Sequence, residues 1–223
     1  MIQAIVWDMD GVLIDSEPLW RQAEVEVLSS LGVPITMPDT IETMGRRIDD
    51  VIRLWFNRSP WEGPSIDVVA QNVVERVIEL VNETGEVKPG VYEAFALLRS
   101  CNMRMALASS SSSVLISAVL QKLELNDFLE FAHSAEHEEF GKPHPAVYLT
   151  AARKLGLAPQ ECLAFEDSGA GVEAAKNAGM KCLCIPDPAI DSNKIQRADL
   201  ILPSLTELRK EHLDMLMCQA KPR

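Results

Sequence analysis

Apolar runs of strand length recur along the chain and alternate with stretches whose apolar residues return every three to four positions. A continuous apolar run is typical of a strand buried on both faces of a parallel sheet. The predicted strands are residues 2–7, 103–108, 131–134, 162–165, 180–185 and 200–202. The predicted helices are residues 92–101, 114–123, 146–155, 172–178 and 205–217. Strands that alternate with helices predict an α/β fold with a mostly parallel, doubly wound sheet.

Residues 16–86 interrupt this alternation. Their apolar positions follow only a helical period, with a turn-rich break at Ser59-Pro-Trp-Glu-Gly-Pro64. We therefore expect residues 1–15 and 87–223 to form an α/β core domain, and residues 16–86 to form a small all-helical cap domain. An insert at the carboxyl end of the first strand lies over the mouth of the binding crevice, so we expect this one to act as a lid.

The composition is that of a soluble globular protein, with 223 residues of which 47% are hydrophobic and 24% charged. The net charge of −12 argues against nucleic acid or an anionic membrane as a partner. No apolar run is long enough to span a bilayer. The five cysteines are odd in number and lie mostly in apolar segments, as packed, reduced thiols do. Because the first strand begins at Ile2, leaving no room for a signal peptide, the sequence predicts a cytoplasmic protein.

Two pairs of acidic residues directly follow predicted strands. Asp8 and Asp10 come after the first strand, and Glu166 and Asp167 come after the strand at residues 162–165. Open α/β sheets bind ligands at the carboxyl ends of their strands. Buried carboxylates are costly unless a cation or a reaction uses them, and carboxylate oxygens are the ligands that Mg²⁺ prefers. The two pairs therefore predict a magnesium site.

Two other kinds of site share parts of this pattern. A calcium loop would use Asp8 and Asp10 as its first ligands, but it needs a bidentate Glu at its twelfth position, where this chain has Leu19. The run Gly169-Ala-Gly171-Val-Glu-Ala174 matches a dinucleotide-binding fingerprint. The acidic pair directly before that run would repel a pyrophosphate, and the run is not at the first strand–helix turn. Metal binding is therefore favoured over nucleotide binding.

Polar residues at two further turns could hold an anion. The run Ser109–Ser113 follows a predicted strand, and its hydroxyls and backbone N–H groups precede a helix. A flexible serine-rich loop would have the same composition. Lys142 lies between Gly141 and Pro143, which constrains its backbone. Beside a carboxylate cluster and a phosphate it would supply a counter-charge, whereas a lone loop lysine is usually solvated.

In chain order, these motifs resemble those of the haloacid dehalogenase (HAD) superfamily of phosphotransferases, and the resemblance covers the whole chain. The most specific motif is Asp8-Met-Asp10-Gly11-Val-Leu-Ile-Asp15-Ser16. The position of the insert resembles that of the small cap in the group containing β-phosphoglucomutase and phosphoglycolate phosphatase. The resemblance implies a Rossmann-like core, Mg²⁺ as cofactor and a phosphorylated substrate. Superfamily dehalogenases lack the second aspartate, so Asp10 favours phosphoryl transfer over carbon–halogen cleavage.

The same resemblance implies a role for each residue of the core motifs. Asp8 would be the nucleophile that forms an aspartyl-phosphate, and Asp10 would be the general acid and base. Mg²⁺ would be held by the Asp8 carboxylate, the Asp10 backbone carbonyl and Asp167, with Glu166 nearby or acting through water. The remaining residues, Ser109, Ser110 through its backbone, and Lys142, would bind the phosphoryl oxygens.

Residues 15–20, 47–55 and 60–65 are similar to bacterial sugar- and hexitol-phosphate phosphatases of the 2-deoxyglucose-6-phosphate phosphatase type. Arg47, its neighbour Arg46, and Glu17 could contact the substrate, and Trp20 could stack on a sugar. All of these side chains could equally serve packing or solvation. The family's mutases carry a His soon after the first motif and a Lys in the cap. This chain has Trp20 near the former place and no Lys between Arg21 and Val87.

The sequence therefore predicts a monomeric, Mg²⁺-dependent phosphatase. Its expected substrates are small sugar or sugar-alcohol phosphate monoesters, with no nucleic acid and no membrane as partner. Three alternatives stay open: a β-phosphoglucomutase-like enzyme, a phosphoglycolate-type phosphatase, and a degenerate member of the family kept as a binding module.

Overall fold

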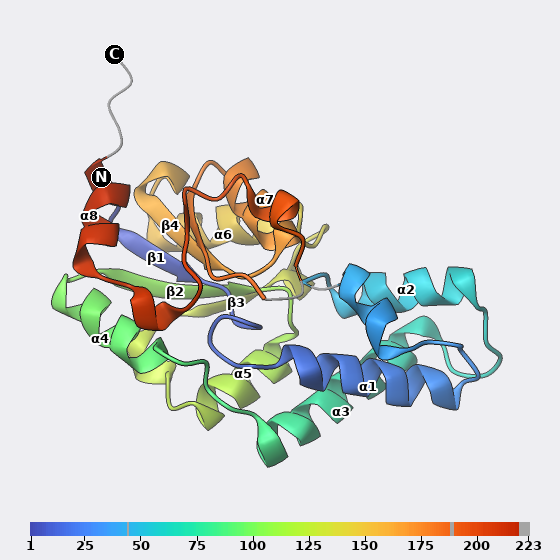
Figure 1. Cartoon of the computed structure of the whole chain (residues 1–223). Helices are drawn as coiled ribbons and strands as arrows, with labels where there is room; N and C mark the ends of the chain where they lie inside the picture. The colour runs from blue at the N-terminus through green and yellow to red at the C-terminus, as the bar shows by residue number, and fades with distance from the viewer. Residues whose placement is uncertain (44, 188–189, 219–223) are drawn as a thin grey trace.

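A single parallel sheet of six strands, in the order β3-β2-β1-β4-β5-β6, forms the centre of the computed structural model, which describes residues 1–43, 45–187 and 190–218 (Figure 1). The strands are β1 Ala4–Trp7, β2 Arg104–Ser109, β3 Ala132–Ser134, β4 Cys162–Glu166, β5 Lys181–Cys184 and β6 Leu200–Ile201. β1 is central, and its Trp7 lies opposite Leu107 of β2 and Phe165 of β4. All six predicted strands and the doubly wound α/β class are confirmed.

Helices cover both faces of the sheet because alternate residues of its strands point in opposite directions. The helices of this region are α4 Val91–Ser100, α5 Ser113–Lys122, α6 Ala146–Leu155, α7 Gly169–Asn177 and α8 Lys210–Cys218. Ile5 and Trp7 of β1 join the apolar cluster that includes α4, α5 and α8. Ala4 and Val6 join the cluster of α6 and α7 on the other face (Figure 1). Each strand side is therefore buried, as the continuous apolar runs require.

The predicted helix 205–217 is wrong in its first turn. The chain forms a short 3-10 turn at Leu205–Glu207, and α8 begins only at Lys210. The hydroxyl of Ser204 accepts a hydrogen bond from the backbone N–H of Thr206, which closes a local turn instead of the first turn of a longer helix. This turn packs against the chain at Gly90, where a Cβ would lie 2.4 Å from the Thr206 nitrogen. Tertiary contact therefore overrides the helical periodicity.

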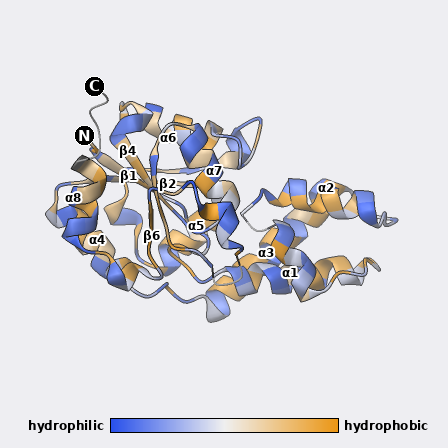
Figure 2. Ribbon diagram, turned by 45° about the horizontal axis from the view of Figure 1, so that its top comes forward, coloured by the Kyte–Doolittle hydropathy of each residue, from blue (hydrophilic) through white to orange (hydrophobic). Residues whose placement is uncertain are grey.

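Residues 16–86 hold helices and no strand in their described part. The elements are α1 Glu17–Ser30, a 3-10 helix at Met37–Thr43, α2 Ile48–Arg58 and α3 Ile66–Thr84. Figure 1 shows these helices together at one end of the sheet. The three α-helices each have a hydrophobic and a hydrophilic side (Figure 2), and α3 packs against both α1 and α2. We refer to residues 16–86 as the helical insert.

The chain leaves and re-enters the α/β region along two adjacent segments. The Asp15 N–H donates to the Glu86 carbonyl at 2.9 Å, and the Lys88 N–H donates to the Leu13 carbonyl at 3.0 Å. The apolar residues of the insert are continuous with the cluster on one face of the sheet, and α3 contacts α5. The division of the chain into two domains at these segments stays a prediction.

The structure also bears on two expectations from the sequence: that no segment spans a membrane and that the cysteines are reduced. Within the described residues, none of the helices combines the length and apolar character that crossing a membrane demands. The thiols of Cys101, Cys162, Cys182 and Cys184 are free, and the last three are buried. The side chain of Cys218 lies outside the described residues.

Candidate active site

The site lies where β1, β2 and β4 end, at the edge of the sheet that faces the helical insert. Lys142 lies between the two acidic pairs. Its ammonium donates to Asp8 Oδ1 at 2.7 Å and to Glu166 Oε1 at 2.6 Å. Lys142 is 3% exposed and Glu166 is fully buried. Two buried carboxylates and a buried ammonium are tolerable together because each charge has a partner of opposite sign.

Both carboxylate oxygens of Glu166 accept hydrogen bonds. Besides Lys142, its Oε1 accepts from the hydroxyl of Tyr148 at 2.5 Å. Its Oε2 accepts from the Asp167 backbone N–H at 3.2 Å and from the Ser168 hydroxyl at 3.4 Å. A glycine at position 171 makes room for this carboxyl, since a Cβ there would lie 1.9 Å from it. Sequence reasoning missed Tyr148 because it falls on the apolar side of a helical pattern.

Asp8 and Asp167 occupy an environment that disfavours negative charge. Burial, together with the charges of Glu166 and Asp10, raises the pKa of Asp8 to about 8, although Lys142 opposes this shift. Burial and the neighbouring carboxylates raise the pKa of Asp167 well above its usual range. Burial disfavours the charged form of Lys142, but the carboxylates of Asp8 and Glu166 outweigh it and raise the pKa of Lys142. The site therefore carries an excess of carboxylates over cations.

A divalent cation would neutralise this excess of negative charge. Oxygens of Asp8, Glu166 and Asp167 lie within 4.8 Å of one another. Asp167 Oδ2 is buried and has no hydrogen-bond partner among the described residues. An orphaned buried carboxylate oxygen beside a second carboxylate is a donor set of the kind that Mg²⁺ prefers. The residues present therefore fit a magnesium ion.

Gly11 allows Asp167 to approach the first motif. Its backbone φ is +70°, and a Cβ at this position would lie 2.0 Å from Asp167 Oδ2. Both the left-handed backbone and the close contact exclude a side chain. We expect Gly11→Ala to lower the free energy of unfolding by roughly 2–5 kcal/mol, because backbone strain and steric overlap add.

Gly32→Ala is the matched control for this prediction. Gly32 has a φ of +81° but no atom within 4 Å of an added Cβ, so only the backbone strain applies. We expect this variant to lose about 1–2 kcal/mol in denaturant unfolding. Equal losses in the two variants would show that the contact between Gly11 and Asp167 is unimportant.

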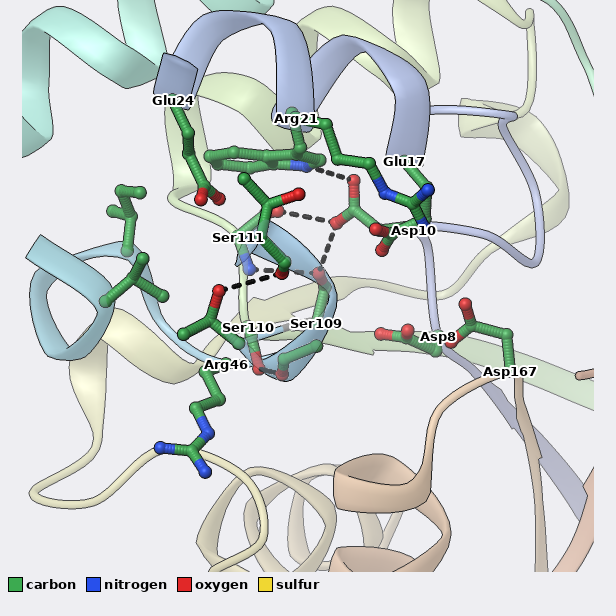
Figure 3. A pocket seen from close by; sticks show the side chains of 16 residues that line it. Asp8, Asp10, Glu17, Arg21, Glu24, Arg46, Ser109, Ser110, Ser111 and Asp167 are labelled. Atoms are coloured by element: carbon green, nitrogen blue, oxygen red, sulfur yellow. Dashed lines mark hydrogen bonds between the residues drawn. The ribbon is translucent and has the colours of Figure 1, made fainter. Parts of the chain in front are cut away.

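The carboxylate of Asp10 is held by hydroxyl and indole donors (Figure 3). Oδ1 accepts from the Ser16 hydroxyl at 2.6 Å and from Trp20 Nε1 at 2.8 Å. Oδ2 accepts from the hydroxyl of Ser111 at 2.6 Å and from that of Ser109 at 3.4 Å. Asp8 and Asp10 therefore sit in different environments, one beside an ammonium and one among neutral donors. From the sequence, Trp20 was a candidate for stacking on a sugar, and Ser111 was not distinguished from the other residues of the serine run.

Ser110 connects the serine loop with the helical insert. Its hydroxyl donates to the Gly45 carbonyl at 3.0 Å, while Ser109 and Ser111 face Asp10. Ser112 accepts from the Leu115 N–H and caps α5. The serine run is thus an ordered turn between β2 and α5, in which two hydroxyls bind Asp10, one binds the insert and one caps a helix.

A pocket of about 40 Å³ lies between this loop and α1. Glu17, which the sequence predicted as a substrate contact, lines it and is buried. Burial and the charge of Asp10 raise the pKa of Glu17 to about 8, while Arg21 opposes the shift. Arg21 and Glu24 line the same pocket, one and two helical turns further along the same side of α1. Neither residue was predicted from the sequence, although their spacing of four and seven positions from Glu17 places them on the same side of a helix.

The structure places Arg47 away from this pocket. Its Nε and Nη2 bind the Asp49 carboxylate at 2.8 and 2.5 Å, and its Nη1 donates to the Glu138 carbonyl at 3.0 Å. Arg47 therefore links the insert to the loop after β3. Its neighbour Arg46 lines the pocket instead. The sequence named both arginines, but consecutive side chains at the start of α2 point in different directions.

Comparison with known proteins identifies the family of the chain. The family model described as haloacid dehalogenase-like hydrolase matches residues 2–179. The chain is 44% identical to hexitol phosphatase B of Escherichia coli (strain K12), over 95% of this chain and 96% of that protein. It is 34% identical to a phosphorylated carbohydrates phosphatase of Thermotoga maritima, over 81% and 83% of the two chains.

Among solved structures, β-phosphoglucomutase from Clostridium difficile superposes with a TM-score of 0.84 at 25% identity, covering 97% of each chain. The family match extends over most of the sequence, and the first motif, the serine loop, Lys142 and the second acidic pair all fall inside it. The chain therefore belongs to the haloacid dehalogenase-like hydrolases.

Proposed function

We propose that the protein is a Mg²⁺-dependent phosphatase that hydrolyses small sugar or sugar-alcohol phosphate monoesters. The observation that carries this proposal is the pairing of two aspartates in unlike environments at the end of β1. Asp8 contacts the Lys142 ammonium, whereas Asp10 is held by neutral donors. Separate environments allow two carboxyl groups to take separate roles in one reaction. The phosphatases to which the chain is similar, named for hexitols and for phosphorylated carbohydrates, support the substrate class.

In this mechanism Asp8 attacks phosphorus and forms an aspartyl-phosphate while the bond to the sugar oxygen breaks. Asp10 gives its proton to the leaving alkoxide and then takes one from the water that hydrolyses the intermediate. The Lys142 ammonium, the Ser109 hydroxyl and the Ser110 backbone N–H would hold the phosphoryl oxygens. Phosphoryl transfer depends mainly on positioning and charge stabilisation, and these groups supply both for the phosphoryl oxygens.

The carboxylates of Asp8 and Asp167, with the backbone carbonyl of Asp10, would hold Mg²⁺. When bound, the ion would supply positive charge that stabilises the transferring phosphoryl group. Both oxygens of Glu166 already accept hydrogen bonds, including those from Lys142 and Tyr148. We therefore assign Glu166 to orienting Lys142, and it could reach the metal through water.

The helical insert would act as the cap of this site. A pocket of about 40 Å³ holds roughly one or two water molecules, so a sugar phosphate can enter only if the insert moves. The paired segments around Asp15 and Glu86 are where such movement would be absorbed. Residues 1–15 and 87–223 would then form the core domain, and residues 16–86 the cap domain. The monomeric state and the cytoplasmic location stay predictions.

A mutase is the second candidate, because of the similarity to β-phosphoglucomutase. One contact argues against it. The residue of α1 that donates a hydrogen bond to Asp10 is Trp20, through its indole N–H. An indole N–H does not titrate near neutral pH, so it cannot relay a proton. The insert also contains no lysine between Arg21 and Val87. Hydrolysis is therefore the activity that the site supports best.

Phosphate release from a panel of phosphate monoesters, measured with Mg²⁺ and again in EDTA, tests the proposal. We expect hexitol and hexose phosphates to be hydrolysed with Mg²⁺, and activity to disappear in EDTA and return when Mg²⁺ is added back. Absence of turnover across the panel would contradict the proposal. Accumulation of glucose 6-phosphate from β-glucose 1-phosphate, without free phosphate, would show a mutase instead.

A further inference from the structure

Two polar side chains of α1, the buried Glu24 and the partly buried Arg21, place buried atoms without hydrogen-bond partners at the pocket. Glu24 is 7% exposed, and its Oε2 has no partner among the described residues. Nε and Nη2 of Arg21 are likewise buried and without hydrogen bonds there. The ion pair that Arg21 makes with Asp187 is long, at 3.9 Å. Figure 3 shows Glu24 and Arg21 reaching from the same helix toward the pocket that contains Asp10.

Hydrogen bonds within the described residues do not satisfy these polar atoms. A buried donor or acceptor without a partner is destabilising, and such groups are uncommon in native proteins. Other polar residues that line the pocket are satisfied: the hydroxyls of Thr40 and Thr43 donate to the backbone carbonyls of Met37 and Thr40. Among the described residues that line the pocket, the unsatisfied buried side-chain atoms are Asp167 Oδ2, which faces the candidate metal site, an acceptor on Glu24 and donors on Arg21. A ligand that enters the pocket can satisfy those of Glu24 and Arg21.

The chemistry of the pair restricts what that ligand can be. An anionic group would suit Arg21 but would meet the carboxylates of Glu24 and Glu17. A cationic group would suit Glu24 but would meet the guanidinium of Arg21. A hydroxyl group both donates and accepts, so different hydroxyls of one molecule can bind the carboxylate and the guanidinium. The arrangement fits a neutral, polyhydroxylated chain or ring.

We propose that Glu24 and Arg21 form a hydroxyl-binding subsite that selects polyhydroxylated leaving groups. This inference rests on the proposed phosphatase function and adds the residues that set its specificity. A site built to hydrogen-bond a substrate hydroxyl discriminates strongly against analogues that lack it. Glu24 and Arg21 would therefore determine the preference for polyol esters over simple esters, while the phosphoryl site treats both alike.

The test compares a hexitol 6-phosphate with p-nitrophenyl phosphate, which has no free hydroxyl on its leaving group. We expect Glu24→Leu to lower kcat/KM for the hexitol ester by about 10- to 100-fold, mainly through a higher KM. For p-nitrophenyl phosphate the change should stay below about threefold, because that ester makes no hydroxyl contact to lose. The thermal unfolding midpoint should not fall, because the variant removes an unsatisfied buried carboxylate.

Glu26→Gln is the matched control, because Glu26 lies on the same helix but binds Arg76 and Gln22 at the surface. It should leave both kcat/KM values unchanged. Glu24→Gln and Arg21→Met repeat the comparison if Glu24→Leu does not fold, and Arg21→Met should show the same selective loss. An equal loss on both esters, or no loss on the hexitol ester, would overturn the subsite. A wild-type protein that hydrolyses neither ester would overturn the proposed function, and the subsite with it.

Discussion

Asp8→Asn is expected to abolish phosphate release, lowering kcat by about 10⁴-fold or more, as removal of a covalent nucleophile does. The amide has nearly the same shape as the carboxylate and can still accept from Lys142, but it cannot attack phosphorus. The measurement is Mg²⁺-dependent phosphate release from a hexitol 6-phosphate and from an aryl phosphate. Both should fall together, because the nucleophile is common to every ester.

The unfolding midpoint of Asp8→Asn shows whether its loss of activity comes from misfolding. The folded pKa of Asp8, about 8, lies above the usual value near 4 for an unfolded chain. The folded state therefore binds the proton more tightly, and its stability falls as the pH rises between these values. Because Asn carries no charge, the unfolding midpoint of Asp8→Asn in metal-free buffer at pH 8 should not lie below that of the wild type. Undiminished turnover in the folded variant would disprove the role of Asp8 as nucleophile.

Lys142→Met is expected to have the largest effect on stability, lowering the free energy of unfolding by about 3–5 kcal/mol at pH 8. Methionine has a similar length, but it leaves the carboxylates of Asp8 and Glu166 buried without their cation. The loss should shrink toward pH 5, because Asp8, already raised in pKa, takes up a proton more readily without Lys142 nearby. Denaturant unfolding of the metal-free protein at several pH values measures both trends.

Lys210→Met is the surface control for this prediction. Lys210 pairs with Asp214 across one helical turn and is largely exposed, so the loss should stay below about 1 kcal/mol. Adding Glu166→Gln to Lys142→Met should restore part of the stability, since it removes one of the two unpaired carboxylates. If Lys142→Met and Lys210→Met were equally stable, the buried ion cluster would not contribute as we argue.

The strands and the core site motifs were predictable because they are encoded locally. A continuous apolar run indicates a buried strand wherever it occurs, and residues directly after parallel strands must meet at one edge of the sheet. Asp8 and Glu166 are therefore brought together by topology, and the loop between β3 and α6 brings Lys142 to them, although 134 and 24 positions separate it from its two partners. Their contacts at 2.6–2.7 Å follow the expectation that a lysine offsets the acidic pairs.

The insert was predictable as helical but not in its side-chain contacts. Arg46 and Arg47 are neighbours in sequence, yet one lines the pocket and the other binds Asp49 and the loop after β3. Trp20 was a plausible stacking residue, but its indole donates to Asp10. Where a long side chain ends depends on how its helix packs against a distant part of the chain, and hydrophobic periodicity carries no information on that orientation.

Sequence alone was sufficient for the α/β class, the order of the strands along the chain, the helical insert and the expectation that Lys142 meets the two acidic pairs. The class, the strand order and the insert follow from periodicity, and the site residues follow from their places after strands together with the resemblance to the family. Folding decided which hydroxyl of the serine run faces Asp10, that Tyr148 completes the environment of Glu166, and that Glu24 and Arg21 remain unsatisfied at the pocket. These features depend on distances between segments far apart in the chain, which exist only once the helices have packed.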